Sequence, residues 1–227
     1  MGRKINPKAL RINITDVWRS RWMSKFGYAK TLKEDVMLRE YIIKNYRVAG
    51  IDRVEIERFN DQLTIIIKTT KPGILIGRAG GGIEDMKKKL KDQFKLSKNF
   101  KINIEEVKNI GLAAQVWANN AADQLEKRFP HRRILKQTLE QVMEAGAKGV
   151  RMAIKGRLGG AEIARTEKLY KGSLPLHTFR THIDYGEATA FTTYGTIGIK
   201  VWINQGEVFK GVKPTDIRSS SEETSTK

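Results

Sequence analysis

The sequence lacks cysteine, has few prolines and acidic residues, and contains no long apolar run. Without cysteine there can be no disulfide, no thiolate nucleophile and no cysteine-based zinc site. No apolar stretch approaches the roughly 18 residues that a membrane-spanning helix needs, and no signal-peptide-like segment follows Met1. We therefore expect neither a disulfide-stabilised scaffold nor a membrane protein.

What the chain has in excess is positive charge. Its 227 residues include 43 Lys and Arg against 25 Asp and Glu, a net charge of +18, and residues 1–50 alone hold 12 basic and 4 acidic residues. A protein so far from neutrality repels itself, and nucleic acid is the polyanion that most often offsets such a charge. The length suffices for one large or two ordinary domains with hydrophobic cores.

No constellation of catalytic or metal-binding residues is visible. The three histidines are His131, His177 and His182, and the last two lie five residues apart on opposite faces of a predicted strand, a poor spacing for a metal site. No lysine is marked as desolvated. We expect no catalytic residue, no metal, no cofactor and no enzymatic activity. An enzyme, such as a nuclease or a lysine-dependent lyase, is kept as a rival hypothesis.

The most informative segment is the glycine-rich stretch Ile76-Gly77-Arg78-Ala79-Gly80-Gly81-Gly82-Ile83. Gly77 and Gly80 let another backbone approach closely, while Arg78 and the amino end of the following helix suit phosphate oxygens. The GxxG loop of KH domains clamps nucleic-acid backbones in this way. A glycine-rich turn without a ligand is the alternative. The RNA-binding residues expected in this loop are Ile76, Gly77, Arg78, Gly80, Gly81 and Ile83.

The pattern around the glycine-rich stretch predicts a domain over residues 31–108. Apolar residues at helical spacing predict a helix over 31–49, and two strands joined near residues 59–62 follow it. The glycine-rich segment, a helix over 84–96 and a strand containing Ile102 and Ile104 complete the order α-β-β-α-α-β.

A second domain is predicted over residues 109–206. Helices over 112–129 and 131–145 precede four strands, an α+β pattern with a mostly antiparallel sheet. In the first strand Val150, Met152 and Ile154 alternate with Arg151 and Lys155, which predicts one buried and one basic face. Residues 207–227 are polar and are predicted to be a disordered tail.

Two further basic segments stand out. Residues 1–30 form a predicted basic arm. Its first 15 residues either order on a polyanion or remain a frayed, solvated terminus. In residues 18–30, aromatic residues such as Trp18 and Trp22 lie among cations, and this part either contacts RNA or packs onto the next domain. Arg132, Arg133 and Lys136 lie at the start of a predicted helix, where the helix dipole disfavours cations. An external anion would remove that conflict, although a solvated helix face is the commoner fate of such residues.

The chain resembles the KH-containing ribosomal protein family of the bacterial-type small subunit, number three in that subunit's series. The resemblance covers roughly residues 1–207 and includes Gly2-Arg3-Lys4-Ile5-Asn6-Pro7 and the loop at 76–83. Its most specific part is Gly156-Arg157-Leu158-Gly159-Gly160-Ala161-Glu162-Ile163-Ala164-Arg165. The family usually has glycine near the position of Ala9, and KH loops often have a second cation where this chain has Ala79.

The resemblance implies a type II KH domain followed by an α+β domain, in a structural protein of the subunit head. It implies binding to small-subunit rRNA and mRNA, and contact with the neighbouring head proteins ten, fourteen and two. The family's cluster at the channel where mRNA enters, which helps to unwind structured mRNA, corresponds to Arg132, Arg133 and Lys136. The expected location is the cytoplasmic ribosome, with an organellar ribosome left open.

Further RNA contacts are expected at both ends of the chain. In the N-terminal arm the expected rRNA-binding residues are Gly2, Arg3, Lys4, Asn6, Pro7 and Arg11. In the C-terminal domain they are Arg151, Lys155, Arg157, Arg165 and Lys168. The alternative function is a free-standing KH-domain regulatory factor, from which the motif at 156–165 distinguishes the ribosomal family.

Overall fold

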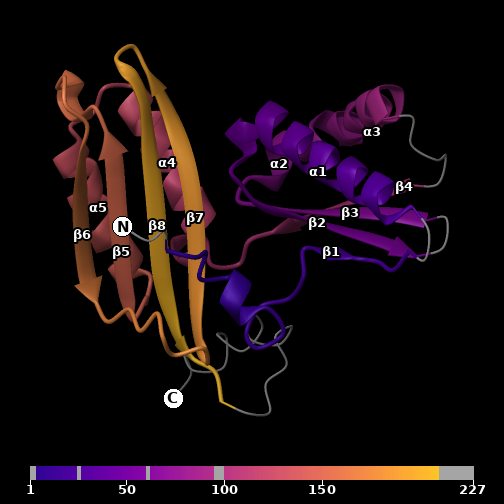
Figure 1. Ribbon diagram of the computed structural model, residues 1–227. Helices are drawn as coiled ribbons and strands as arrows, with labels where there is room; N and C mark the ends of the chain where they lie inside the picture. Colours follow the sequence, from indigo (N-terminus) through magenta and orange to yellow (C-terminus); the bar gives the residue numbers. More distant parts are fainter. Residues whose placement is uncertain (1–3, 25–26, 60–61, 95–99, 210–227) are drawn as a thin grey trace. The chain divides into compact units, whose positions relative to one another are not determined.

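The computed structural model describes residues 4–24, 27–59, 62–94 and 100–209 (Figure 1). These residues form two compact units. One consists of residues 19–108, and the other combines the residues up to Trp18 with those from Asn109 onward. The latter, called the C-terminal unit below, is therefore built from two segments that are far apart in the sequence.

The unit of residues 19–108 has the predicted order of elements. It consists of α1 (Tyr28–Asn45), β2 (Ile51–Phe59), β3 (Gln62–Thr69), α2 (Pro72–Ile76), α3 (Gly81–Phe94) and β4 (Phe100–Glu106). The short strand β1 (Ser20–Arg21) adds to the sheet, whose order is β1-β2-β3-β4. Strands β2 and β3 are antiparallel, whereas β1 pairs parallel to β2 and β4 parallel to β3. The helix predicted over residues 31–49 begins earlier, at Tyr28, and ends at Asn45; a separate 3-10 turn, Arg47–Ala49, follows it.

Alternating isoleucines bury one face of this sheet against the helices. Ile56, Ile65 and Ile67 are fully buried and belong to the same hydrophobic cluster as Leu38 of α1 and Leu90 of α3. β-branched residues suit the pleated surface of a strand. The core of this unit therefore fixes α2 and α3, and with them the glycine-rich loop that joins these two helices.

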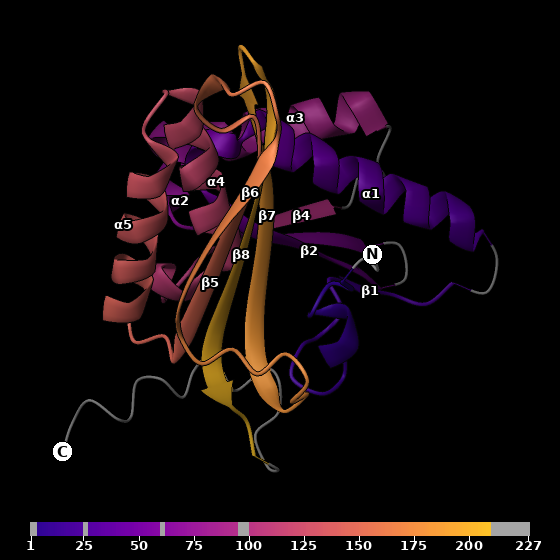
Figure 2. The same cartoon turned by 60° about the vertical axis from the view of Figure 1, so that its left-hand side comes forward.

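The other unit has two helices on one face of an antiparallel sheet (Figures 1 and 2). Its elements are α4 (Ala114–Glu126), α5 (His131–Glu144), β5 (Gly149–Gly156), β6 (Arg165–Gly172), β7 (Thr181–Thr192) and β8 (Gly195–Glu207). The strand order is β6-β5-β8-β7, and every neighbouring pair is antiparallel. A Cβ on Gly186 would lie 2.5 Å from the backbone of Ala114, so a glycine permits α4 to approach β7 closely.

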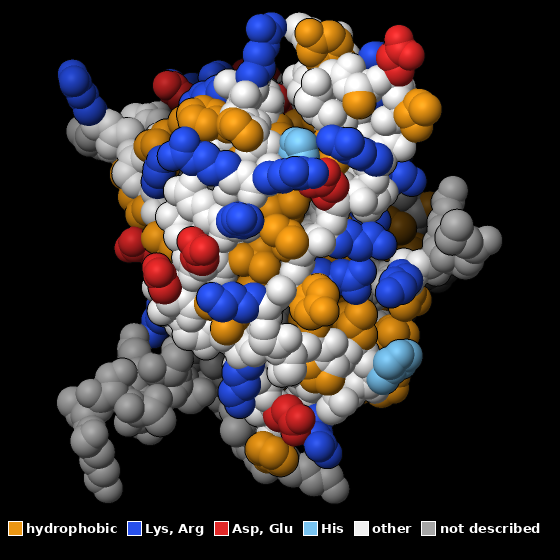
Figure 3. Space-filling model, turned by 90° about the vertical axis from the view of Figure 1, so that its left-hand side faces the viewer, with side chains coloured by type: hydrophobic (Ala, Val, Ile, Leu, Met, Phe, Trp, Pro, Cys, Tyr) orange, Lys and Arg blue, Asp and Glu red, His pale blue; other side chains and the backbone are white. Residues whose placement is uncertain are grey.

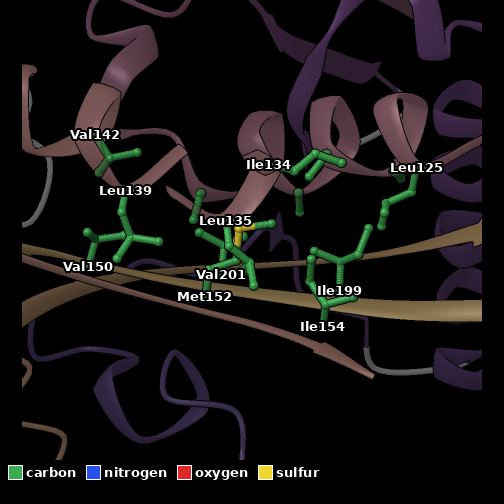
Figure 4. Close-up of a cluster of buried hydrophobic side chains, with 14 of the residues drawn as sticks. Leu125, Ile134, Leu135, Leu139, Val142, Val150, Met152, Ile154, Ile199 and Val201 are labelled. Atoms are coloured by element: carbon green, nitrogen blue, oxygen red, sulfur yellow. The ribbon is translucent and has the colours of Figure 1, made fainter. Parts of the chain in front are cut away.

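The core of this unit lies between the helices and the sheet. Leu135, Leu139 and Val142 of α5 belong to this core, and Figure 4 shows Leu135 close to Met152 of β5 and Val201 of β8, and Leu139 close to Val150 of β5. Because these side chains occupy one face of α5, the basic residues at the start of that helix project away from the core. The α+β architecture predicted from the sequence is confirmed.

The N-terminal residues differ from the predicted arm. Residues 4–18 pack with the C-terminal unit, whereas residues 19–24 belong to the other unit, where Trp22 donates a hydrogen bond of 2.7 Å from Nε1 to Asp35 Oδ2. Of the two roles left open for the aromatic segment, packing is thus the one that Trp22 adopts. The predicted tail begins at the end of β8, and residues 210–227 lie outside the described residues.

Candidate nucleic-acid interface

The loop between α2 and α3 is shaped by glycines that no other residue replaces easily. Gly77 has φ 70° and ψ −174°, and Gly80 has φ 82°, both conformations that L side chains rarely adopt. A Cβ on Gly77 would lie 2.9 Å from the nitrogen of Gly82, whereas one on Gly80 would meet no atom within 4 Å. The loop is therefore tightly folded at Gly77 and open to an approaching ligand at Gly80.

The side chains around this loop combine charge with exposed apolar surface. Arg78 is exposed, and the residue before the loop, Ile76, is 38% exposed. Leu75 and Met86 are buried in the core and hold α2 and α3 in place, while Ile83 packs partly against the same core. A nucleic-acid backbone laid along the loop would meet glycine backbone, a guanidinium group and an apolar rim, the chemistry that KH domains use on RNA.

A second cationic cluster lies where α5 begins. Arg132, Arg133 and Lys136 are exposed, and the side chain of Arg132 is 76% exposed. One carboxylate, Glu167 of β6, lies 3.1 Å from His131 Nε2 and 3.6 Å from Arg132 Nε. Partial burial would raise the pKa of Glu167, but hydrogen bonding and charge from His131 and Arg132 lower it below its usual value.

The structure separates the predicted C-terminal RNA contacts into three places. Arg165 lies on the α5 side of the sheet, where its Nε is 3.6 Å from Glu167 Oε1. Arg151, Lys155 and Lys168 lie on the opposite face, as the strand register requires. Arg157 lies in the turn after β5, donates hydrogen bonds to the carbonyls of Ala161 and Tyr194, and stacks 5.9 Å from the Tyr194 ring. Figure 3 shows Lys and Arg side chains gathered over the side of this unit that α5 and β6 form.

The predicted N-terminal contacts divide between surface and core. Lys4 and Asn6 are exposed, and Gly2 and Arg3 lie outside the described residues. Pro7 and Arg11 are buried, and the Arg11 guanidinium donates to the carbonyls of Thr181, Pro7, Leu176 and Thr178 at 2.8 to 3.1 Å. The prediction that Arg11 contacts rRNA is therefore wrong, because its donors are used inside the protein. Burial also lowers the pKa of Arg11, against an opposing effect of Asp16.

Sequence reasoning missed Arg128, in the turn between α4 and α5. This exposed residue has φ 63°, and the N–H groups of Arg128 and Phe129 close the end of α4 by bonding to the carbonyls of Leu125 and Gln124. Glycine is the usual residue at such a helix end. A further exposed cation thus lies four residues before Arg132 in the sequence, and nothing in the sequence pattern reveals its backbone conformation.

The part of the chain that the structure describes contains no group of three His, Cys, Asp or Glu residues able to hold a metal ion. His182 contacts Gln205 Oε1 through Nδ1 at 2.8 Å and lies near Asp16. It is a packed residue at the start of β7. Within the same described residues, no helix has both the length and the apolar character to span a membrane.

Comparisons with known proteins agree on both units. Residues 37–111 match the family described as KH domain, and residues 121–203 match that described as ribosomal protein S3, C-terminal domain. The small ribosomal subunit protein uS3 of Syntrophomonas wolfei is 49% identical over 213 residues, covering 94% of this chain and 93% of the relative. That of Exiguobacterium sibiricum is 46% identical over 223 residues, covering 98% of this chain and 100% of the relative.

Proposed function

Because the chain belongs to the uS3 family of small ribosomal subunit proteins, we propose that it binds small-subunit rRNA in the head of the subunit and lines the channel where mRNA enters. Membership makes the chain a structural ribosomal component rather than an enzyme. It also makes the free-standing KH factor the weaker hypothesis, because residues 121–203 match a ribosomal domain. The relatives are bacterial, which supports a place on a cytoplasmic ribosome.

In this proposal the glycine-rich loop holds an RNA backbone. The support is the open space above Gly80 together with the exposed Arg78 and the apolar rim at Ile76. The remaining predicted residues of the loop, Gly77, Gly81 and Ile83, shape its backbone. The C-terminal unit offers further exposed RNA contacts at Lys4 and Asn6. Ala79 stands where many KH loops have a second cation, so the loop alone is expected to bind weakly.

The single observation that carries the mRNA role is the exposed cluster at the start of α5. Arg132, Arg133 and Lys136 project from a helix whose opposite face is buried by Leu135 and Val142. Cations at a helix amino end cost stability through the dipole, so their presence favours an external anion. A basic surface that follows a single strand would bind unpaired mRNA and resist a duplex.

Head proteins ten, fourteen and two are the proposed neighbours of this chain in the small subunit.

The test replaces these three cations by alanine in the full chain. Because all three are exposed, each change should alter the free energy of unfolding by no more than about 0.5 kcal/mol, and the variant should enter small subunits normally. It should translate unstructured messages at the normal rate but stall on a hairpin placed just downstream of the channel. The measurement is a translation time course on paired messages with and without the hairpin.

A matched control removes the same charge elsewhere. Lys87, Lys88 and Lys91 are exposed on α3, and their triple alanine variant loses three cations from the other unit. It should show no hairpin-specific delay. Equal slowing of the α5 variant on both messages, or its failure to sediment with small subunits, would show that the cluster instead docks onto rRNA.

A further inference from the structure

In the described part of its own unit, the sheet of β5 to β8 carries α4 and α5 on one face and no α-helix on the other (Figure 2). Helices α4 and α5 pack against the side chains of Val150, Met152 and Ile154 in β5, so Arg151, Ala153 and Lys155 lie on the opposite face. The register then defines three rows across that face. From β6 to β7 they are Tyr170–Arg151–Trp202–Tyr185, Lys168–Ala153–Lys200–Glu187 and Thr166–Lys155–Gly198–Thr189.

The first row is built from aromatic rings and one guanidinium. The Arg151 guanidinium lies 5.3 Å from the centre of the Trp202 ring, and the Trp202 and Tyr185 rings lie 5.5 Å apart at an angle of 49°. Tyr170, which pairs with Arg151 in the ladder, is 79% exposed. Tyr185 is buried at the β7 side, so the accessible aromatic surface comes from Tyr170 and the partly exposed Trp202.

The rest of the face is cationic. Lys155, Lys168 and Lys200 are exposed in the two neighbouring rows, and Arg151 is partly exposed. The one carboxylate in these rows, Glu187, accepts a hydrogen bond of 2.7 Å from the Tyr185 hydroxyl and lies 3.9 Å from Lys200 Nζ. The three rows thus hold four cations against one acid, arranged beside exposed rings.

The sheet of the other unit shows that this charge is not a general property of the chain. On its helix-free face, Glu55 lies 3.1 Å from Arg21 Nη2 and 3.0 Å from Arg53 Nε. Lys68 Nζ lies 3.4 Å from Glu55 and 3.3 Å from Glu105. Those cations are neutralised by neighbouring carboxylates, whereas Arg151, Lys168 and Lys155 lie in successive rows that share a single carboxylate, Glu187 of β7.

We propose that the helix-free face of the C-terminal sheet binds single-stranded RNA, with bases stacked on Tyr170 and Trp202 and phosphates held by Lys155, Lys168 and Lys200. The inference rests on the proposed RNA-binding function and assigns a second RNA site to it. Tyr170 and Trp202 are separated by one strand, roughly 10 Å, which accommodates two stacking positions. Aromatic rings among exposed cations are the usual composition of a surface that binds single strands, because every base has a face that can stack and every phosphate carries a charge.

The experiment compares two ligands with the full chain: a 12-nucleotide adenosine oligomer and an abasic oligomer with the same number of phosphates. The Y170A/W202A variant should lose on the order of tenfold in affinity for the adenosine oligomer, the range expected for lost base stacking, and should bind the abasic oligomer as the unchanged protein does. The control Y170F/W202F keeps both rings and should retain the affinity. Thermal unfolding of each variant checks that the unit is folded.

Three results for the Y170A/W202A variant would overturn the proposal. The first is an unchanged affinity for the adenosine oligomer. The second is a loss of affinity for the abasic oligomer that equals the loss for the adenosine oligomer, and the third is normal RNA binding by a variant whose assembled subunit has lost a neighbouring protein. Should W202A impair folding, Y170A alone decides, because that ring is 79% exposed. A G80D variant with the sheet intact tests the KH loop separately, so failure of one RNA site is distinguishable from failure of the other.

Discussion

At the scale of single residues, two N-terminal cations have structural partners in the C-terminal unit. Arg11 is surrounded by backbone carbonyls rather than by a carboxylate. Lys8 forms an ion pair with Asp184, which also accepts a hydrogen bond of 2.7 Å from the N–H of Ala114 at the start of α4. Asp184 thus joins the N-terminal segment, β7 and α4, and the three lose a shared contact if its charge is removed.

The D184N variant should lower the free energy of unfolding by about 2–4 kcal/mol at pH 7. Burial would raise the pKa of Asp184, but the Lys8 charge, the Ala114 N–H and His182 lower it below its usual value. A depressed folded pKa contributes stability that is complete above the unfolded pKa, near 4, and is lost as pH falls through the folded pKa. The difference between the two proteins should therefore shrink below about pH 4, as measured by denaturant titrations between pH 7 and pH 3.

The matched control is E207Q, which removes a carboxylate from an exposed ion pair with Arg180. That change should cost less than about 1 kcal/mol at any pH in this range. If D184N stayed equally destabilised at pH 3, the contribution of Asp184 would come from shape or hydrogen bonding rather than from its charge.

At the scale of elements, the glycine-rich loop joins two helices by a backbone that is compact on one side and open on the other. Gly82 belongs to the closed side, because a Cβ there would lie 2.5 Å from the carbonyl oxygen of Leu75. Gly77 contacts Gly82 in the same way. Substitutions at these two glycines would disturb the fold of the loop as well as any ligand, so they separate the two effects poorly.

Gly80 provides the sharper test of RNA binding by this loop. In G80D the added side chain enters open space, and its carboxylate would repel a phosphate approaching the loop. We expect a loss of about tenfold or more in affinity for single-stranded RNA, with a cost of about 1 kcal/mol in stability from the positive φ. Titration of an RNA oligomer into both proteins measures the first quantity, and urea unfolding the second.

G73D serves as the control for added charge. Gly73 lies in α2, has open space around its Cβ position and adopts no positive φ. Its carboxylate would lie outside the loop, so RNA affinity should fall much less than in G80D. Identical RNA affinities of the unchanged protein, G80D and G73D would show that the loop is not part of the RNA-binding surface.

At the scale of the whole molecule, the chain begins in one unit, builds the other, and then returns to the first. Residues 19–24 contribute β1 and the Trp22 hydrogen bond to the unit of residues 19–108. Asp35, which accepts that bond, is fully buried and also contacts Arg58 Nη2 at 2.7 Å. A domain boundary at residue 31 would cut through these contacts.

We therefore predict that a fragment of residues 19–108 is more stable than one of residues 31–108. The shorter fragment lacks β1 and leaves the buried Asp35 without its indole donor, a charge-assisted hydrogen bond worth about 1.5–3 kcal/mol. Urea unfolding followed by circular dichroism measures the difference. W22F in the longer fragment isolates the indole N–H. Equal stability of the two fragments would mean that residues 19–24 are only loosely attached.

The net charge of +18 predicts how RNA binding by the full chain depends on salt. If about six to eight phosphates are neutralised in the complex, the logarithm of the association constant should fall with the logarithm of salt concentration at a slope near −5 or steeper. Titrations with a single-stranded RNA at four or more salt concentrations give the slope. A value near −1 would show that most of the cations face solvent or protein rather than RNA.

The sequence by itself determined the class of the protein, the order of its elements and the position of the KH loop. Those properties depend on local signals: apolar periodicity sets the helices and strands, glycine marks the loop, and the charge balance indicates a polyanionic partner. The families matched over residues 37–111 and 121–203 agree with the two predicted domains in type.

The tertiary structure alone decided which cations are available to a ligand. Arg11 and Arg78 are both arginines that the sequence predicts to bind RNA, yet one is buried among carbonyls and the other is exposed on a loop. Likewise Tyr170, Arg151 and Trp202 are far apart in the sequence and become one row only through the order β6-β5-β8-β7. The physical reason is that burial and cross-strand pairing depend on long-range packing, which no short sequence window contains.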